Sequence, residues 1–334
     1  AAFDALIQLN SYEGPVNLAE IDASTFSAMT SYWTRLGPIG QGDPRRSAAF
    51  VRSIARLTQK LRFAPSALAG LRTNSIALVR VEANYSTWRI ALSDKSCGPD
   101  LLREFVGPVG DAKYRAGEYL ARDGAKMNLE AAEAVTQVVT AMRGGGPALC
   151  IQAARILAHF KQDALPALPE LTNALRALDR ELRLAAVRAI EAIGPAASNA
   201  IPSLIESLND PITQGQAAGA LGAFGPAASA AVPKLVELLS NPAKFAGSVE
   251  LRSNAARALG QIGVANEVVL SVLRQAAGDS DARIRVAAGE ALQRLAPSRS
   301  RGLRSIRSNR SAHPRNEISL PLRGRPTFAA ISVH

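Results

Sequence analysis

The chain has 334 residues, of which 47% are hydrophobic, so it is long enough for two ordinary domains or for one extended array with its own core. Its two cysteines, Cys97 and Cys150, exclude a disulfide framework and a cysteine-rich metal site. The net charge is +11, but residues 298–334 hold eight Arg and one Glu, which leaves only +4 for the rest of the chain. The basic character therefore belongs mainly to the C-terminal end.

The N-terminal region, residues 1–97, shows no convincing repeat. We expect helices at 16–36 and 46–61, separated by a loop rich in Gly and Pro. Residues 75–92 contain β-branched and aromatic side chains, which are compatible with a short β-hairpin or with a divergent helix pair, and the pattern leaves both open. We predict that residues 1–97 form either an N-terminal cap on the rest of the chain or a small separate module.

From residue 98 to 297 the sequence repeats an apolar helix, a short turn and an Ala-rich helix that usually ends at Gly. The second helices show the repeat most clearly, at 183–194, 214–225, 252–263 and 285–295. Three first helices carry Pro-x-Leu, at 169–171, 202–204 and 233–235. A period in the low thirties identifies a solenoid, in which each helix pair buries its apolar face against its neighbours. Alignment on the Ala-Ala core of the second helix predicts six units: 98–124, 125–160, 161–193, 194–224, 225–262 and 263–297.

The C-terminal segment, residues 298–334, lacks helical periodicity and is rich in Arg, Ser and Pro. It has too little apolar surface to offset the entropy lost on ordering, so we expect disorder. The predicted fold is thus all-α: an α-solenoid (superhelix) of about six helix pairs, a divergent N-terminal cap and a disordered basic tail.

The repeated unit resembles the HEAT repeat, and more closely its short bacterial form, also named after phycobilisome-lyase-like repeats. The resemblance rests on Ala-Ile-Pro-Ser-Leu204 and Ala-Val-Pro-Lys-Leu235 in first helices, and on residues 251–263 in a second helix. It implies an armadillo-like helical architecture, which in this family serves as a scaffold, adaptor or regulatory subunit and occasionally as an enzyme.

An Arg stands at the start of three second helices: Arg183, Arg252 and Arg285. HEAT-like repeats usually place an Arg here that pairs with a turn Asp of a neighbouring unit. The resemblance therefore implies a structural role for these three residues.

A second series of Arg residues lies further along the second helix, at the position between its two Ala pairs. Arg155, Arg188 and Arg257 occupy this position and would line one face at roughly one repeat spacing, as a row that could contact carboxylates or phosphates. They could equally be solvated charges that keep the protein soluble. The remaining members of the series are Glu118, Gly219 and Glu290, so its ends are acidic.

Catalytic and cofactor motifs are not evident. The three histidines, His159, His313 and His334, are not followed by Glu, so the sequence lacks the His-Glu pairs of the HEAT-like hydroxylases that bind two irons. The Gly-rich turns at 37–42 and 144–146 lack the spacing of phosphate-binding loops. We therefore predict a protein that is not an enzyme and that holds no metal or cofactor.

The predicted function is a non-catalytic protein–protein interaction or scaffolding module, whose second helices line a concave face that binds a protein or peptide. The alternative is a nucleic-acid-binding protein that uses the Arg-rich tail and the Arg row. The longest uncharged stretch, 211–233, is broken by three Pro and four Gly, so we predict no transmembrane segment. The start at Ala1 lacks an apolar signal run and favours the cytoplasm, with export if a leader preceded it.

Overall fold

The computed structural model describes residues 44–45, 48, 51–52, 68, 70–90, 94–241 and 249–296. The chain divides into two units, Ala1–Leu295 and Ala296–His334, and the first is described here by itself. The predicted disordered tail and the predicted helix at 16–36 lie outside the described residues. The boundary predicted at residue 97 stays a prediction.

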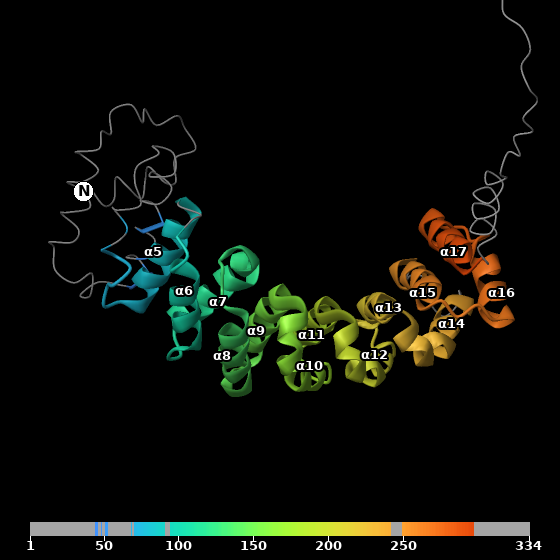
Figure 1. The fold of residues 1–334 in the computed structure, drawn as a ribbon, viewed down its shortest axis with the longest axis horizontal. Coiled ribbons are helices and arrows are strands. Elements are labelled where there is room, and N and C mark those ends of the chain that lie inside the picture. Colours follow the sequence, from blue (N-terminus) through green and yellow to red (C-terminus); the bar gives the residue numbers. More distant parts are fainter. Residues whose placement is uncertain are drawn as a thin grey trace, which may run out of the picture. The chain divides into compact units, whose positions relative to one another are not determined.

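Helix pairs follow one another along the first unit, with short connections (Figure 1). Within 94–241 and 249–296 the pairs are α6 (Cys97–Val106) with α7 (Asp111–Asp123), α8 (Ala131–Gly144) with α9 (Pro147–Phe160), α10 (Leu168–Ala174) with α11 (Arg180–Ile193), α12 (Ile201–Ser207) with α13 (Gln214–Ala223), α14 (Val232–Ser240) with α15 (Val249–Ile262), and α16 (Glu267–Ala276) with α17 (Ala282–Leu295). In the same two ranges, four 3-10 helices lie between pairs: η2 (Gly124–Lys126), η3 (Lys161–Ala167), η4 (Gly194–Ala200) and η5 (Gly225–Ala231).

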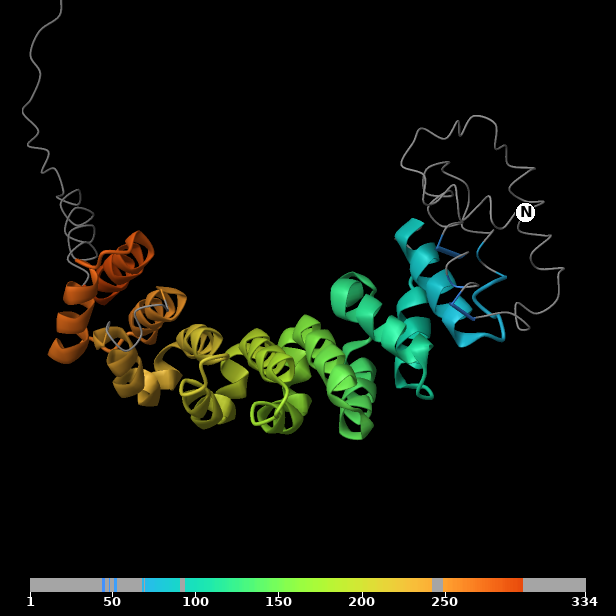
Figure 2. The ribbon, with the colours of Figure 1, turned by 180° about the vertical axis from the view of Figure 1, so that it is seen from behind.

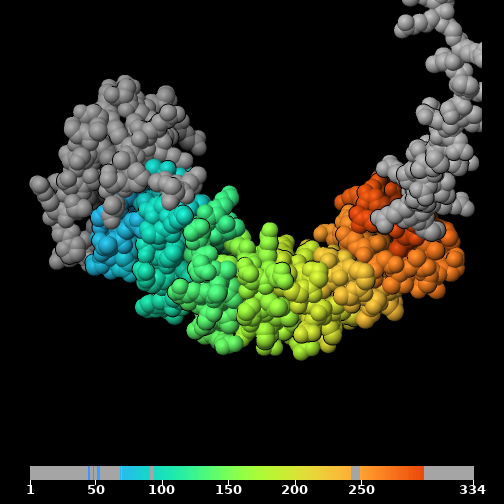
Figure 3. All heavy atoms as spheres, in the orientation of Figure 1, coloured from blue at the N-terminus to red at the C-terminus, as the bar shows by residue number. Residues whose placement is uncertain are grey.

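The helices form two layers. Consecutive second helices pack on one another, from α7 through α9, α11, α13 and α15 to α17, and α6 packs on α8 and α14 on α16 in the layer of first helices. Figure 2 shows the same two rows from behind, and in Figure 3 the side chains of successive units from green to yellow meet without open gaps on the face shown. The predicted α-solenoid of six helix pairs is therefore confirmed.

One unit shows how the sequence produces this arrangement. The side chain of Asp179 caps α11 by accepting a hydrogen bond from the N–H of Leu182 at 2.9 Å. Apolar residues at helical spacing, such as Ala186 and Ile190, are fully buried against the neighbouring helices. Gly194 ends the helix at φ +77°, a conformation that glycine adopts without strain.

The three Arg residues at the start of second helices bind the turns beside them. The Nε of Arg183 lies 2.7 Å from Asp210 Oδ2 of the next unit, and its Nη1 donates to the carbonyl oxygens of Ala177 and Leu178, both at 2.9 Å. Arg252 pairs with Asp279 of the next unit, and both side chains are nearly buried. Arg285 donates to the carbonyl oxygens of Asp279 and Ser280. These contacts satisfy carbonyl groups that the turns would otherwise leave unpaired.

The hairpin considered for residues 75–92 is wrong: residues 77–90 form one helix, α5 (Ala77–Ile90). Ten of its residues are buried, and it packs on α6 and α7. Strand propensity misleads here, because packing on neighbouring helices overrides the local preference of β-branched and aromatic residues. A helix buried on most sides also has no polar face, so its sequence shows no helical period.

Helix α5 has the register of a second helix. Arg80 donates from Nη1 to the carbonyl oxygens of Asn74 and Ser75, and its Nε lies 2.6 Å from Glu104 Oε1 of the next unit. This is the same set of contacts that Arg183 makes in α11. The packing of second helices therefore begins upstream of residue 97, within the region that the sequence set apart.

Within the described ranges, no helix combines the length and the apolar character needed to cross a membrane.

Candidate functional site

The predicted Arg row lies on the layer of second helices. Arg155 in α9, Arg188 in α11 and Arg257 in α15 are all exposed. The helix between the last two, α13, presents Gly219 at the equivalent position. The structure thus places Arg155 and Arg188 on adjacent helices and Arg257 two helices further along.

None of the three makes the turn contacts described above for Arg183. Arg155 is half exposed, and its Nη2 lies 3.7 Å from Glu181 Oε2. Arg257 donates from Nη1 to Asn254 Oδ1 at 3.0 Å. Burial raises the pKa of Glu191, and the nearby charge of Arg188 partly offsets that effect. Their guanidinium groups therefore remain largely available to a ligand, with acidic groups close to two of them.

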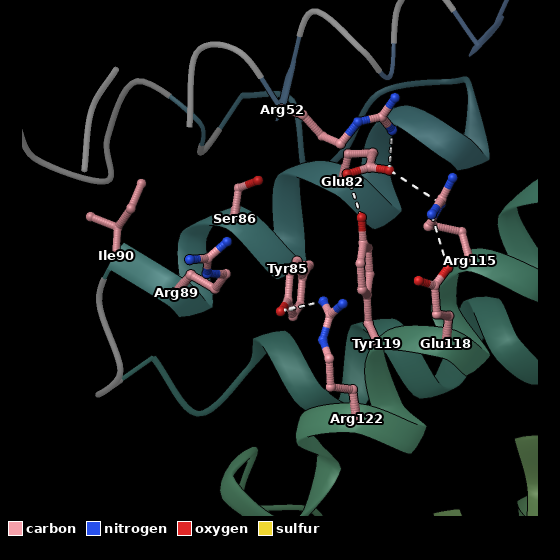
Figure 4. Close-up of a pocket in the computed structure, with 10 residues that line it drawn as sticks. All are labelled: Arg52, Glu82, Tyr85, Ser86, Arg89, Ile90, Arg115, Glu118, Tyr119 and Arg122. Atoms are coloured by element: carbon pink, nitrogen blue, oxygen red, sulfur yellow. Dashed lines mark hydrogen bonds and ion pairs between the residues drawn. The ribbon is translucent and has the colours of Figure 1, made fainter. Parts of the chain in front are cut away.

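A second candidate site lies between α5 and α7, where a cavity of about 210 Å³ opens beside the same layer (Figure 4). Its lining residues come from α5, from α7 and from one residue upstream: Arg52, Glu82, Tyr85, Ser86, Arg89, Ile90, Arg115, Glu118, Tyr119 and Arg122. We call this cavity the α5–α7 pocket.

The floor of the α5–α7 pocket holds a buried carboxylate. Glu82 is fully buried, its Oε1 accepts a hydrogen bond from Arg52 Nη1 at 2.6 Å, and its Oε2 accepts one from the Tyr119 hydroxyl at 2.8 Å. The Nε of Arg115 lies 3.6 Å from the same carboxylate. A buried charge with this many partners is stable, whereas loss of one partner would leave it uncompensated.

Two tyrosines close the pocket beside Glu82. The rings of Tyr85 and Tyr119 stack with centroids 3.7 Å apart and planes 6° from parallel. The guanidinium of Arg122 lies 5.1 Å from the Tyr85 ring centroid and 5.3 Å from that of Tyr119, and its Nη2 donates to the Tyr85 hydroxyl at 2.6 Å. That hydroxyl donates to Asp123 Oδ2 at 2.8 Å. Burial raises the pKa of both phenols, so they stay protonated at neutral pH.

The rim of the pocket is mainly cationic. Arg89, Arg115 and Arg122 reach it together with Glu118, which accepts a hydrogen bond from Arg115 Nη1 at 2.9 Å. Arg89 is exposed and makes no hydrogen bond or ion pair with any residue that the structure describes. Together, the rim and the floor of the pocket hold four Arg and two Glu side chains. The pocket therefore has a net positive charge and favours an anionic ligand.

Sequence reasoning missed this pocket for a specific reason. Glu82, Tyr85 and Arg89 share one face only if residues 77–90 are helical, because helical neighbours lie three and four residues apart. In a β-hairpin, side chains alternate between faces, so the same three residues would not share one face. The usable signal was Arg80, which stands 33 residues before the buried Lys113, at the period of the array.

Other polar groups of interest have structural partners. His159 Nε2 lies 2.8 Å from the carbonyl oxygen of Ala121, and Cys150 Sγ lies 3.2 Å from that of Met142. Cys97 is buried, and burial raises the pKa of its thiol to about 12. Among the residues that the structure describes, no three His, Cys, Asp or Glu side chains gather as metal ligands would.

Comparison with known proteins concerns the type of repeat and the fold of the array. Residues 168–246 match a family model of HEAT repeats, while no curated protein gives a match to the sequence. The chain is similar in fold to an engineered protein of known structure, at 19% identity with a TM-score of 0.59, over 83% of this chain and 79% of that one.

Two further structures give weaker matches. One is the complex of CpcE and CpcF of phycocyanin lyase from Nostoc sp. PCC7120, at 20% identity, a TM-score of 0.40 and coverage of 75% of this chain and 94% of that one. The other is a designed armadillo repeat protein, at 17% identity, a TM-score of 0.38 and coverage of 81% and 99%. The predicted resemblance is confirmed at the level of a match: residues 168–246 match the HEAT-repeat model, and the described helices form an α-solenoid.

Proposed function

We propose that the protein is a non-catalytic interaction module that binds a protein or peptide partner on the layer of second helices. The observation that carries the proposal is the availability of Arg155, Arg188 and Arg257 on that layer, outside the contacts that hold the turns together. Arg is favoured at interfaces because its planar guanidinium binds carboxylates in two-point contacts.

The pattern of buried residues supports the same assignment. Within each unit the apolar residues pack between helices. In α15, for example, Ala255, Ala256 and Leu259 are fully buried. The exposed position between them, Arg257, contributes nothing to that core. A solenoid offers such positions at every repeat, which is why repeat arrays present long binding surfaces.

The first test reverses the charge of the Arg row. We expect the triple variant Arg155→Glu, Arg188→Glu, Arg257→Glu to lose capture of the native partner while its thermal unfolding midpoint changes little, since all three side chains are exposed. Capture is read by a photo-crosslinking amino acid introduced at position 216 of α13, between the Arg-bearing helices.

The matched control places the same crosslinker at position 206 of α12, on the opposite layer, where Glu206 is exposed. Equal crosslinking from positions 206 and 216, or capture that the triple reversal leaves unchanged, would remove the second-helix layer as the binding face.

Binding of nucleic acid through residues 298–334 and the Arg row stays the alternative prediction. It requires affinity for single- or double-stranded DNA that falls steeply as salt rises, because phosphate contacts release counterions. It also requires that deletion of residues 298–334 removes most of that affinity. The acidic neighbours Glu181 and Glu191 on the layer weigh against phosphate backbones there.

A further inference from the structure

We propose that the α5–α7 pocket binds the carboxylate of an acidic side chain, presented by a peptide segment of the partner. This inference rests on the proposed function, because the peptide belongs to the protein that the second-helix layer binds. It adds the chemical character of one partner segment and the place where it docks.

The free hydrogen-bond donors at the rim define the ligand. Arg89 lines the pocket and has no partner among the described residues, which therefore leave its N–H groups open to a ligand. Arg122 uses Nη2 on Tyr85 and Nε on Asp123, and Arg115 uses Nη1 on Glu118. Each of these two guanidinium groups keeps further N–H donors. Guanidinium donors in a partly enclosed site favour a carboxylate, which accepts two parallel hydrogen bonds.

The floor of the pocket argues against a nucleobase. A base would need a free aromatic face, but Tyr85 and Tyr119 stack on each other and Arg122 lies over both rings. Both tyrosine side chains are also almost fully buried. Aromatic residues that bind single-stranded nucleic acid present their faces to solvent, so this pair does not have that role.

The carboxylate of Glu118 limits how many negative charges the ligand can bring to the rim. A chain of phosphates would bring several negative charges against the Glu118 carboxylate at the rim, whereas a single carboxylate can approach Arg89, which Figure 4 shows across the pocket from Glu118. The floor carboxylate of Glu82 is already paired with Arg52 and accepts a hydrogen bond from the Tyr119 hydroxyl. The pocket therefore fits one acidic side chain better than a polyphosphate backbone.

The test measures binding of a fluorescein-labelled octapeptide, with one Glu among Gly and Ser residues and an amidated C-terminus, to the full chain by fluorescence anisotropy. We expect Arg89→Glu to weaken binding by about tenfold or more, because a charge-assisted hydrogen bond is lost and a repulsion is added. The matched control is Arg294→Glu in α17, an exposed Arg with the same change of charge, which should weaken binding less than about twofold.

A second variant keeps the test independent of folding. Glu118→Gln removes the carboxylate that competes for Arg115, so we expect it to strengthen binding of the single-Glu peptide by about two- to fivefold. A variant that merely damaged the fold would not bind more tightly. Equal weakening by Arg89→Glu and Arg294→Glu, or no gain from Glu118→Gln, would overturn the proposal.

A competing probe separates the ligand classes. Fluorescein-labelled octathymidylate that binds more tightly than the single-Glu peptide, and loses that affinity in Arg89→Glu, would also overturn it. None of these variants touches Arg155, Arg188 or Arg257, so failure of the pocket and failure of the Arg row are separate results.

Discussion

At the scale of single residues, one side-chain contact recurs along the array. A long cationic side chain near the start of a second helix reaches back to a carbonyl oxygen six residues earlier. The residues that make this contact are Arg80, Lys113, Arg183 and Arg285. No backbone N–H of the described residues donates to these carbonyl oxygens, so such a side chain supplies the missing donor.

Two Asp side chains that pair with Arg residues at the start of second helices make stability depend on pH. Partial burial raises the pKa of Asp210, but hydrogen bonds from the N–H of Ile212 and from Arg183 outweigh it, so the pKa lies below its ordinary value. For Asp279, the N–H of Asp281 and then the guanidinium of Arg252 also lower the pKa, against partial burial. A carboxyl whose pKa is lower in the folded state stabilises the fold when it is ionised.

We therefore expect a loss of stability on acidification. The contribution is complete above the unfolded pKa of about 4 and is lost as pH falls through the lower folded pKa. Urea unfolding at a series of pH values from 7 to 2.5 measures it. The variant Asp210→Asn should be less stable at pH 7 and show a shallower acid dependence. Identical pH profiles for wild type and variant would contradict this role for Asp210.

At the scale of helices, close packing between second helices depends on small residues. A Cβ added to Gly260 in α15 would lie 2.6 Å from the Cα and Cβ of Ala291 in α17. Neither atom can move without shifting a helix, so glycine is required there by the approach of two backbones. Gly289, in α17 itself, would meet no atom within 4 Å.

These two glycines give a matched pair of variants. We expect Gly260→Ala to destabilise the fold by about 1–3 kcal/mol, the range for overpacking a filled core. Gly289→Ala should stabilise it by about 0.5–1 kcal/mol, because alanine favours the helix more than glycine does. Chemical denaturation of both variants gives the comparison. Similar unfolding midpoints for the two would show that α15 and α17 do not approach as closely as described.

Prediction of the elements succeeded where local signals and packing agree. Ala pairs, Pro-x-Leu and the terminal Gly mark α10 to α13 because each residue type has a local reason for its place. It failed at α5, where Val79, Val81 and Trp88 favour a strand and only contacts with α6 and α7 stabilise the helix.

At the scale of the whole unit, α5 is part of the same core as the repeats. Val81, Tyr85 and Trp88 are buried in one cluster with Leu101 and Phe105 of α6. In a repeat array each unit covers the apolar face of the next, so a terminal unit cannot be removed without exposing its neighbour. The proposed boundary at residue 97 therefore falls between helices that pack on each other.

Truncation tests that boundary. We expect a chain of residues 98–334 to unfold at a lower temperature than the full chain and to bind an apolar dye, because large side chains of α6 and α7 lose their cover. Thermal unfolding followed by circular dichroism gives the midpoint. An unchanged midpoint with no dye binding would instead make residues 1–97 a separable module.

The sequence by itself determined the class of fold and the period of the array, because each repeat carries its own caps, apolar face and small residues within about thirty positions of chain. The sequence also placed Arg155, Arg188 and Arg257 at equivalent positions of their repeats. Only the tertiary structure brought Glu82 and Tyr85 of α5 together with Arg115 and Tyr119 of α7, because the α5–α7 pocket depends on contacts between segments more than thirty residues apart. Local patterns do not encode such contacts, and the packing of α5 on α7 creates them.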